Sequence, residues 1–260
     1  MITKVESNEQ YHQSAAISAS GLKTIYETSV WHFLNKKPYT TSSMNLGTAV
    51  HTAILEPKQF YKDYTVMPKF DGRTKAGKEA KAEFYEQANL EQKEILEEAD
   101  YEKITGILNT LNDKNLLASV IAKEYCQGEK EISHYLNFQG VDVRVRPDNI
   151  NRIAGFISDV KTCQKNTPRA FRSDIYKYNY HLQAAFYSDA LGLPPENFVF
   201  IACETNHPFG VQSYSLSDEM IEQGRNAYNK ALSDWQFYLD TGVALGYSGY
   251  ETSTEGVIKL

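Results

Sequence analysis

Hydrophobic residues recur at helical spacing over most of the first half of the chain. Ser20 is a suitable N-cap for a helix whose apolar positions run from Leu22 to Leu34. A short helix is predicted over Asn45–Glu56, because Pro57 follows it directly. Between about Lys75 and Lys123 the sequence is rich in Glu, Lys, Ala and Leu, which predicts two or three helices with a break near 112–115.

The period then changes to two, which is typical of strands. Strands are predicted over Glu131–Phe138 and Val141–Val145, joined at Gln139-Gly140, with a third strand of the same meander over Arg152–Val160. The remaining predicted elements are a helix opened by Thr167-Pro168 and ending near Tyr178, a helix over Tyr180–Leu191, strands over Phe198–Cys203 and Val211–Leu216, and a helix capped by Ser217 that runs to about Asp240.

This order of elements predicts an α/β (α+β) fold with a mixed central sheet flanked by helices. We expect a single domain over 1–240, with a helical N-terminal part over about 18–125 and a catalytic core over about 129–240. Residues 241–260 are rich in Gly, Ser, Thr and Tyr, which favours an irregular C-terminal tail.

Composition narrows the class of protein. Of the 260 residues 42% are hydrophobic, which excludes a disordered chain, and no apolar run approaches the roughly 20 residues of a membrane span. The N-terminus lacks the apolar segment of a secretion signal, and the three cysteines are dispersed, without a Cys-x-x-Cys pair. We therefore expect a cytoplasmic protein with no membrane partner.

The net charge of -6 argues at first against a nucleic-acid partner. The charge is unevenly distributed, however: 144–177 holds eight Lys or Arg against three Asp, a local +5, so the rest of the chain carries -11. A second basic stretch spans 69–81. The residues predicted to contact DNA phosphates are Arg73, Lys75, Lys78, Arg169, Arg172 and Lys177.

Two carboxylates and one lysine are placed for chemistry in the predicted meander. Asp148 ends one strand and Asp159 lies near the end of its neighbour, while Lys161 follows on the same strand face as Asp159. Such a trio suits magnesium-assisted hydrolysis of a phosphodiester, because carboxylates bind the ion and the ammonium offsets negative charge. The alternative is a turn residue and an ordinary surface ion pair.

Two further motifs accompany this trio. Gly47-Thr48-Ala49-Val50-His51 has the form Gly-x-x-x-His, and Gln183-Ala184-Ala185-Phe186-Tyr187 has the form Gln-x-x-x-Tyr. With Pro147-Asp148 and Asp159-Val160-Lys161, these motifs resemble the PD-(D/E)XK nuclease superfamily in its RecB-like branch, and RecE-type exonucleases in particular. The resemblance covers roughly residues 11–240, which suggests a nuclease module alone.

The resemblance implies roles for individual residues. Asp148, Asp159 and the backbone carbonyl of Val160 would ligate the catalytic ion, with His51 as a further ligand. Lys161 would be the catalytic lysine. Glu131 would help to hold a second ion or the attacking water, although a solvated strand-end charge is an equal alternative. Gln183 and Tyr187 would contact the scissile phosphate or brace the lysine. The ion would be Mg²⁺, with Mn²⁺ as a substitute because imidazole is a softer ligand than oxygen.

The same resemblance implies an activity and partners. A RecE-type enzyme would degrade linear double-stranded DNA from the 5′ end and leave 3′ single strands for a RecT-like annealing recombinase. It would form a homo-oligomeric ring, a tetramer, and would come from a phage or prophage in a bacterial cytoplasm. Two alternatives stay open: a single-strand-specific or endonucleolytic RecB-like nuclease, and a non-catalytic DNA-binding protein on the same fold.

Overall fold

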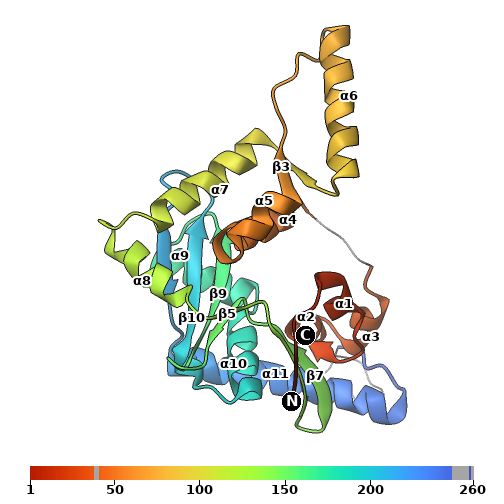
Figure 1. Ribbon diagram of the computed structural model, residues 1–260. Helices are drawn as coiled ribbons and strands as arrows, with labels where there is room; N and C mark the ends of the chain where they lie inside the picture. Colours follow the sequence, from red (N-terminus) through yellow and green to blue (C-terminus); the bar gives the residue numbers. More distant parts are fainter. Residues whose placement is uncertain (38–40, 248–257, 259–260) are drawn as a thin grey trace.

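A five-stranded mixed sheet forms the centre of the structure, a computed structural model that describes residues 1–37, 41–247 and 258 (Figure 1). The strands lie in the order β11-β10-β9-β8-β5. Their bounds are β5 Glu129–Lys130, β8 Asn149–Asn151, β9 Phe156–Cys163, β10 Phe198–Glu204 and β11 Val211–Tyr214. β9 and β10 pair in parallel, and the other pairs are antiparallel. β10 is buried along all but its last residue, as expected for a strand covered on both faces.

The shortness of β8 determines where a site can form. β8 pairs with β9 only at Phe156, Ile157 and Ser158, so in the described part of the chain the stretch 159–163 of β9 is paired on its β10 side alone. The unpaired edge of a strand presents free backbone N–H and C=O groups to whatever lies beside it. Side chains and helices, rather than another strand, must therefore complete this edge.

A second sheet has the order β1-β6-β7-β2. Its strands are β1 Ile2–Lys4, β2 Ile17–Ser18, β6 Ser133–Phe138 and β7 Val141–Val145. The β6–β7 hairpin turns at Gln139 and Gly140, which both have positive φ, as a type I′ turn requires. The chain crosses from this sheet to the central one between Val145 and Asn149.

Helices cover both faces of the central sheet. On one face α2 Ala19–Glu27, α9 Pro168–Lys177, α10 Tyr180–Leu191 and α11 Asp218–Thr241 enclose the larger core. On the other face α4 Ser42–Leu55, α5 Pro57–Asp63, α7 Glu98–Leu111 and α8 Leu117–Tyr125 enclose a second core. Side chains on opposite faces of the strands pack into the two cores. Ile157 and Phe200 belong to the larger core, and Val160 and Ile201 to the second. The smaller elements are α1 Asn8–Gln13, α3 Val30–Asn35 and the 3₁₀ turn η1 Pro195–Asn197.

One close contact holds α10 in place. Gly224 of α11 packs against the backbone of α10, and a Cβ there would lie 2.2 Å from the carbonyl oxygen of His181. Only glycine permits this approach, because real Cβ atoms do not come so near to a backbone oxygen. α10 is buried almost throughout, so its position is fixed on all sides.

A projection, which we call the arm, comprises residues 64–96. Two parallel strands, β3 Tyr64–Val66 and β4 Glu94–Leu96, form its base. α6 Lys75–Leu90 stands out from the body and begins at the outer tip (Figure 1). Thr74 caps α6 by accepting the N–H of Gly77 at 3.0 Å, and Ala88 is the only residue of this helix that is buried.

The α/β fold expected from the sequence is confirmed, with corrections to several element bounds. The first predicted helix corresponds to α2 and begins after Ser18, whose hydroxyl accepts the N–H of Gly21, so Ser20 is not the cap. This helix also ends at Glu27, because Ser29 is extended and caps a separate α3. The predicted strand 152–160 starts too early: Arg152–Gly155 form a turn, in which Asn151 accepts the N–H of Ala154.

The remaining differences are smaller. The long helical region after Lys75 contains three helices, with the predicted break at 112–115 between α7 and α8. A further break, at β4, was not predicted. The last strand ends at Tyr214 instead of Leu216. Most of the predicted irregular tail, 248–257 and 259–260, lies outside the described residues. None of the helices in the described part of the chain is both long and apolar enough to span a membrane.

Candidate active site

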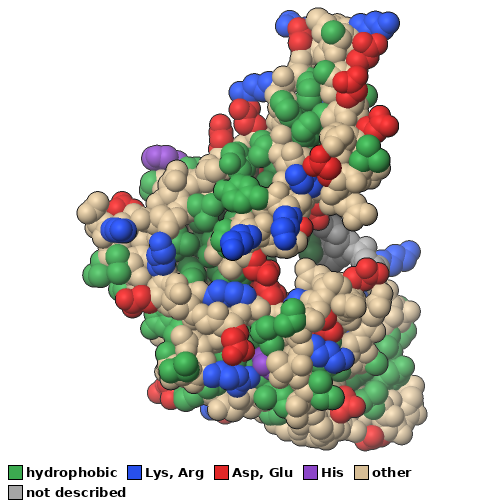
Figure 2. Space-filling view, in the orientation of Figure 1, with side chains coloured by type: hydrophobic (Ala, Val, Ile, Leu, Met, Phe, Trp, Pro, Cys, Tyr) green, Lys and Arg blue, Asp and Glu red, His purple; other side chains and the backbone are tan. Residues whose placement is uncertain are grey.

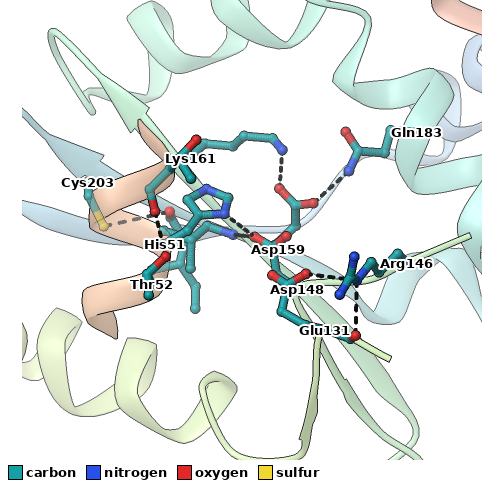
Figure 3. A network of polar contacts seen from close by, with 12 residues as sticks. His51, Thr52, Glu131, Arg146, Asp148, Asp159, Lys161, Gln183 and Cys203 are labelled. Atoms are coloured by element: carbon teal, nitrogen blue, oxygen red, sulfur yellow. Dashed lines mark hydrogen bonds and ion pairs between the residues drawn. The ribbon is translucent and has the colours of Figure 1, made fainter. Parts of the chain in front are cut away.

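Asp159 and Lys161 lie on one face of β9, two residues apart, as the sequence predicts. The Lys161 ammonium forms an ion pair with Oδ1 of Asp159. The side-chain amide of Gln183, on α10, donates to Oδ2 of the same carboxylate at 2.6 Å. Asp159 is 1% exposed, so both of its oxygens are held in a fixed orientation inside the protein (Figure 3).

Asp148 lies between β7 and β8, where the chain passes from one sheet to the other. Its Oδ2 accepts the backbone N–H of Val160 at 2.7 Å. That N–H belongs to the part of β9 that β8 does not reach, so the carboxylate satisfies an edge donor of the sheet. The two acids thus come together as the sequence predicts, with Asp148 held at Val160, next to Asp159. The predicted three-stranded meander is wrong, however, because β6 and β7 belong to one sheet and β9 to the other, and Asp148 lies between strands rather than at the end of one.

His51 reaches the same point from α4, on the opposite side of the sheet from α10. The glycine of its motif, Gly47, lies against β9: a Cβ there would be 3.6 Å from Oγ1 of Thr162. One turn further along the helix, Nδ1 of His51 lies 3.2 Å from Oδ2 of Asp148. The four-residue spacing therefore places Gly47 and His51 on the same side of the helix, toward β9 and Asp148.

Glu131 joins this group, but not from a strand. β6 begins at Ser133, and Glu131 has a φ of 50° between β5 and β6, which corrects the expectation that it starts the strand. Arg146 holds it twice: its Nε lies 3.3 Å from the carboxylate and also donates to the Glu131 carbonyl at 3.0 Å. The left-handed backbone turns the side chain toward the site (Figure 3).

These donors fit a divalent cation. One ligand atom each from His51, Glu131 and Asp148 lie within 4.8 Å of one another. The carboxylate of Asp159 lies beside this group but is directed at Lys161 and Gln183 (Figure 3). Oδ1 of Asp159 is buried and, apart from the Lys161 ion pair, has no hydrogen-bond donor among the described residues. An imidazole with several carboxylate oxygens is a donor set that Mn²⁺ and Mg²⁺ accept.

The protonation equilibria also favour a bound cation. Burial raises the pKa of Asp148, and Asp159 raises it further, against the effects of His51, Lys161 and the Val160 N–H. Burial and then Asp148 raise the pKa of Glu131 to about 8, although Arg146 lowers it. Carboxylates crowded in this way repel one another, and a divalent ion among them would relieve the repulsion.

Lys161 has the opposite tendency. Burial alone would lower its pKa, but Asp159 and Asp148 raise that pKa well above the ordinary value for lysine. Its Nζ also lies 4.9 Å from the centroid of the Tyr180 ring, on the first turn of α10. The side chain therefore stays an ammonium, which can donate hydrogen bonds and offset negative charge but cannot accept a proton.

The two residues of the Gln-x-x-x-Tyr motif are not equivalent in the structure. Gln183 contacts Asp159 directly, whereas Tyr187 lies one turn deeper, 6% exposed, and shares hydrogen bonds with the backbone of Arg146 and the side chain of Tyr11. Burial raises the pKa of Tyr187 well above its ordinary value, so it stays a neutral phenol. Tyr187 thus contacts the segment that carries Asp148, at the backbone of Arg146.

Lys23 of α2 is a site residue that the sequence did not reveal. Its amine donates to Oε1 of Gln183 at 2.9 Å and lies 5.1 Å from the centroid of the Tyr180 ring. A lysine on a helix 160 residues away in sequence carries no local motif. The one local indication of a role for Lys23 is that it lies between Leu22 and Ile25, which are both buried in the core.

The predicted phosphate contacts form two separate groups. Arg169, Arg172 and Lys177 lie on exposed positions of α9, the helix that directly precedes α10. Arg73, Lys75 and Lys78 lie at the start of α6, at the tip of the arm. Figure 2 shows acidic side chains mixed with the basic ones along the arm. Arg73 pairs with Asp71 at 3.1 Å and Lys75 with Glu79 at 3.7 Å, so the tip is less basic than its lysines and arginines suggest.

Comparisons with known proteins agree with the fold. The chain is similar in structure to a protein of Eubacterium rectale described as "Putative exonuclease", with a TM-score of 0.59 and 15% identity over 92% of this chain and 88% of that chain. A second solved structure, of the protein SSO0001, has a TM-score of 0.32 and 13% identity over 85% and 81% of the two chains, which is too distant to support an argument. A comparison with curated proteins found no match.

A family model covers nearly the whole described chain. It matches residues 18–249 and is described as a PDDEXK-like domain of unknown function (DUF3799). The matched range contains all four of the motifs that suggested the PD-(D/E)XK superfamily, and it includes the helical N-terminal part as well as the core. The chain therefore belongs to the family of PDDEXK-like domains.

Proposed function

We propose that the protein is a divalent-metal-dependent exodeoxyribonuclease of the RecE type, which degrades linear double-stranded DNA from the 5′ end. The observation that carries the proposal is the convergence of Asp148, Asp159 and Lys161 at the open edge of β9, with His51 and Glu131 beside them. A structural ion pair would need only one acid for Lys161. Two further carboxylates and an imidazole, gathered beside that pair, exceed this need.

Each residue of the site has a proposed role in metal binding. His51, Asp148, Asp159 and the carbonyl of Val160 would hold Mg²⁺, or Mn²⁺ in its place, and Glu131 would hold a second ion or orient the attacking water. A bound ion of this kind polarises the phosphate and lowers the pKa of a coordinated water. Because Asp148 and Glu131 have raised pKa values in the metal-free protein, ion binding must compete with their protons.

The ammonium of Lys161 would offset the charge that develops on the phosphate. Its raised pKa keeps it cationic at every working pH, and its position beside Asp159 places that charge next to the ion ligands. Gln183 holds the other oxygen of Asp159, so the carboxylate cannot rotate when substrate arrives. Tyr187 supports the backbone of Arg146 behind the site.

The finer features of the proposal rest on the RecE-like motifs. They are digestion from the 5′ end, 3′ single strands passed to a RecT-like annealing recombinase, a tetrameric ring around the duplex, and a phage or prophage origin in a bacterial cytoplasm. The exposed basic side chains of α9 support DNA binding, because such phosphate contacts are independent of sequence. Light scattering after size exclusion measures the oligomer, and a monomer in solution would count against the ring.

A single assay tests the activity. Linear duplexes labelled at the 5′ or the 3′ end, and a closed circular duplex, are incubated with Mg²⁺, with Mn²⁺ and with EDTA. We expect release of the 5′ label, a metal requirement and an intact circle, and no cleavage by Asp159→Asn. Cutting of the circle would identify an endonuclease, and intact linear DNA under all conditions would favour a DNA-binding protein without catalysis.

A further inference from the structure

Lys23 reaches the site from a helix that carries none of the site's motifs. Its amine donates to the carbonyl oxygen of the Gln183 amide at 2.9 Å, and the amide nitrogen donates to Asp159 at 2.6 Å. These two bonds form a continuous chain from α2 through α10 to β9. Gln183 is 8% exposed, so the protein supplies its polar contacts.

The chemistry of the three groups permits only one orientation of the amide. A carboxylate has acceptors and no donor, and the Lys23 amine can donate whether it is charged or neutral. The amide must therefore turn its oxygen to Lys23 and its NH₂ group to Asp159. Without Lys23 the Gln183 oxygen would be left without its donor, and a buried acceptor in that state gains by moving to another rotamer.

The surroundings of Lys23 show that its position is held. Its amine and that of Lys161 lie 5.1 Å and 4.9 Å from the centroid of the same Tyr180 ring, which places an aromatic face close to both cations. A parallel link joins the same two helices, since Asn179 donates to Glu27 at 2.7 Å. Lys23 and Glu27 are one helical turn apart, as are Asn179 and Gln183, so the two contacts set the register of α2 on α10.

The placement is also electrostatically costly, which supports a role beyond packing. Burial, and then the neighbouring Lys161, lower the pKa of Lys23 to about 7, while Asp159 and Glu27 act in the opposite direction. The charged or titratable groups that face it are Glu27 on α2, Asp159 and Lys161 on β9, and His181 on α10. Amines shifted this far concentrate at functional sites.

We propose that Lys23 is a positioning residue of the nuclease site, which holds the Gln183 amide with its NH₂ group on Asp159. With Gln183 on one oxygen and Lys161 on the other, the Asp159 carboxylate has a fixed plane. The inference rests on the proposed function for its consequence in catalysis, but the contact itself does not.

A double-mutant cycle tests the inference: Lys23→Met, Gln183→Leu and the double variant, with Lys23→Arg as the conservative variant. Each single change should lower kcat about tenfold to a hundredfold, as loss of a group supporting a metal ligand does, with KM changed by less than about threefold. The double variant should be no slower than Gln183→Leu, because Lys23 acts through that amide. Lys23→Arg should recover most of kcat. Lys4→Met, which also removes an amine near a tyrosine ring, 5.0 Å from the centroid of Tyr135, should not change kcat.

A second readout separates this inference from the proposed function. The rise in melting temperature on adding Mn²⁺ should be smaller in Lys23→Met and Gln183→Leu, by the same amount, than in the unmodified protein and Lys4→Met. If the unmodified protein cleaves no DNA, this pattern still supports the positioning role while the proposed function fails. Should Lys23→Met not fold, Lys23→Gln, which is too short to reach Gln183, takes its place in the cycle.

Three results would overturn the inference. Multiplicative losses in the double variant with a raised KM would mean that Lys23 contacts DNA directly. Unchanged kcat and unchanged Mn²⁺ stabilisation in Lys23→Met would mean that the Gln183 amide keeps its place without it. Failure of Lys23→Arg to recover kcat, in a folded protein, would mean that the donor to the amide is not what matters.

Discussion

The carboxylate of Asp148 accepts the backbone N–H of Val160 at 2.7 Å, where a neighbouring strand would otherwise supply the acceptor. β8 begins at Asn149, which pairs with Ser158 of β9. Asp148, the residue before it, is no longer paired with β9 as part of a strand. Asp148 therefore ties the crossing between the two sheets to the centre of the larger one. The same carboxylate contacts His51. Asp148 therefore both pairs an edge N–H of the sheet and belongs to the candidate metal site.

Because of this double role, we expect Asp148→Asn to lose cleavage without losing stability. The amide oxygen can still accept the Val160 N–H, and the variant no longer buries a charge beside Asp159, so we expect a metal-free melting temperature equal to or above that of the unmodified protein. Cleavage should fall roughly a hundredfold or more, since a ligand charge is lost. Asp148→Leu is the matched control: it should lose cleavage and also about 1–3 kcal/mol of stability, because the N–H is left unpaired. Full cleavage by Asp148→Asn would exclude this acid from the site.

Glu131 predicts how metal-free stability depends on pH. Folding raises its pKa from the ordinary 4.5 to about 8, so between these values the folded protein binds a proton that the unfolded chain does not. The free energy of unfolding should therefore fall as the pH rises from about 4.5 to 8. Denaturant titrations in EDTA at several pH values measure this slope, and Glu131→Gln should flatten it.

The same shift predicts a pH dependence of metal binding. An ion must displace the proton from Glu131, so Mn²⁺ should raise the melting temperature more at pH 8.5 than at pH 6. In Glu131→Gln the difference between the two pH values should shrink. An equal effect of Mn²⁺ at both pH values in the unmodified protein would contradict a role for Glu131 near the ion.

Lys161→Met should abolish detectable cleavage while leaving DNA binding within about threefold, because its single charge is one of many that face the duplex. It should also lower the metal-free melting temperature, since Asp159 is left buried without its cation, and Mn²⁺ should recover much of that loss. Because the pKa of Lys161 is raised, its titration should not limit activity between pH 7 and 10. Gel-shift and melting measurements on the same preparation check all three.

The sequence predicted those parts of the site whose residues lie close together on one strand or one helix. Asp159 and Lys161 share a strand face by their spacing, and Gly47 and His51 share a helix side, so motif and structure agree. Lys23 was missed because its contact depends on how α2 packs on α10, which no spacing encodes. The turn after Asn151 was missed because Ile153, in an apparently apolar strand pattern, is fully exposed in the structure.

The two basic groups predict a test of DNA binding. Replacing Arg169, Arg172 and Lys177 together by Gln should raise KM and reduce the dependence of log KM on log salt by about 0.9 for each phosphate that is no longer neutralised, with kcat unchanged. The equivalent change at Arg73, Lys75 and Lys78 should act in the same direction, but less, because Asp71 and Glu79 already pair with two of them. A triple change at the exposed Lys58, Lys62 and Lys114 controls for net charge.

Gly224→Ala should destabilise the protein by about 2 kcal/mol or more, since its Cβ would collide with the carbonyl of His181 and push α10 away. Because α10 also carries Gln183, cleavage should fall even at temperatures where the variant is folded. Gly246→Ala, where an added Cβ meets nothing within 4 Å, is the matched control. Chemical denaturation and kcat measured together would refute the coupling if only one of them changed.

The arm leaves and re-enters the body through neighbouring parallel strands, with Met67 donating to Leu96 at 2.9 Å where it departs. Residues between 67 and 93 can therefore lengthen, shorten or be exchanged while both attachment points stay where they are, and every residue of the active site lies outside this stretch. The length of the arm can thus change without moving any group of the candidate active site.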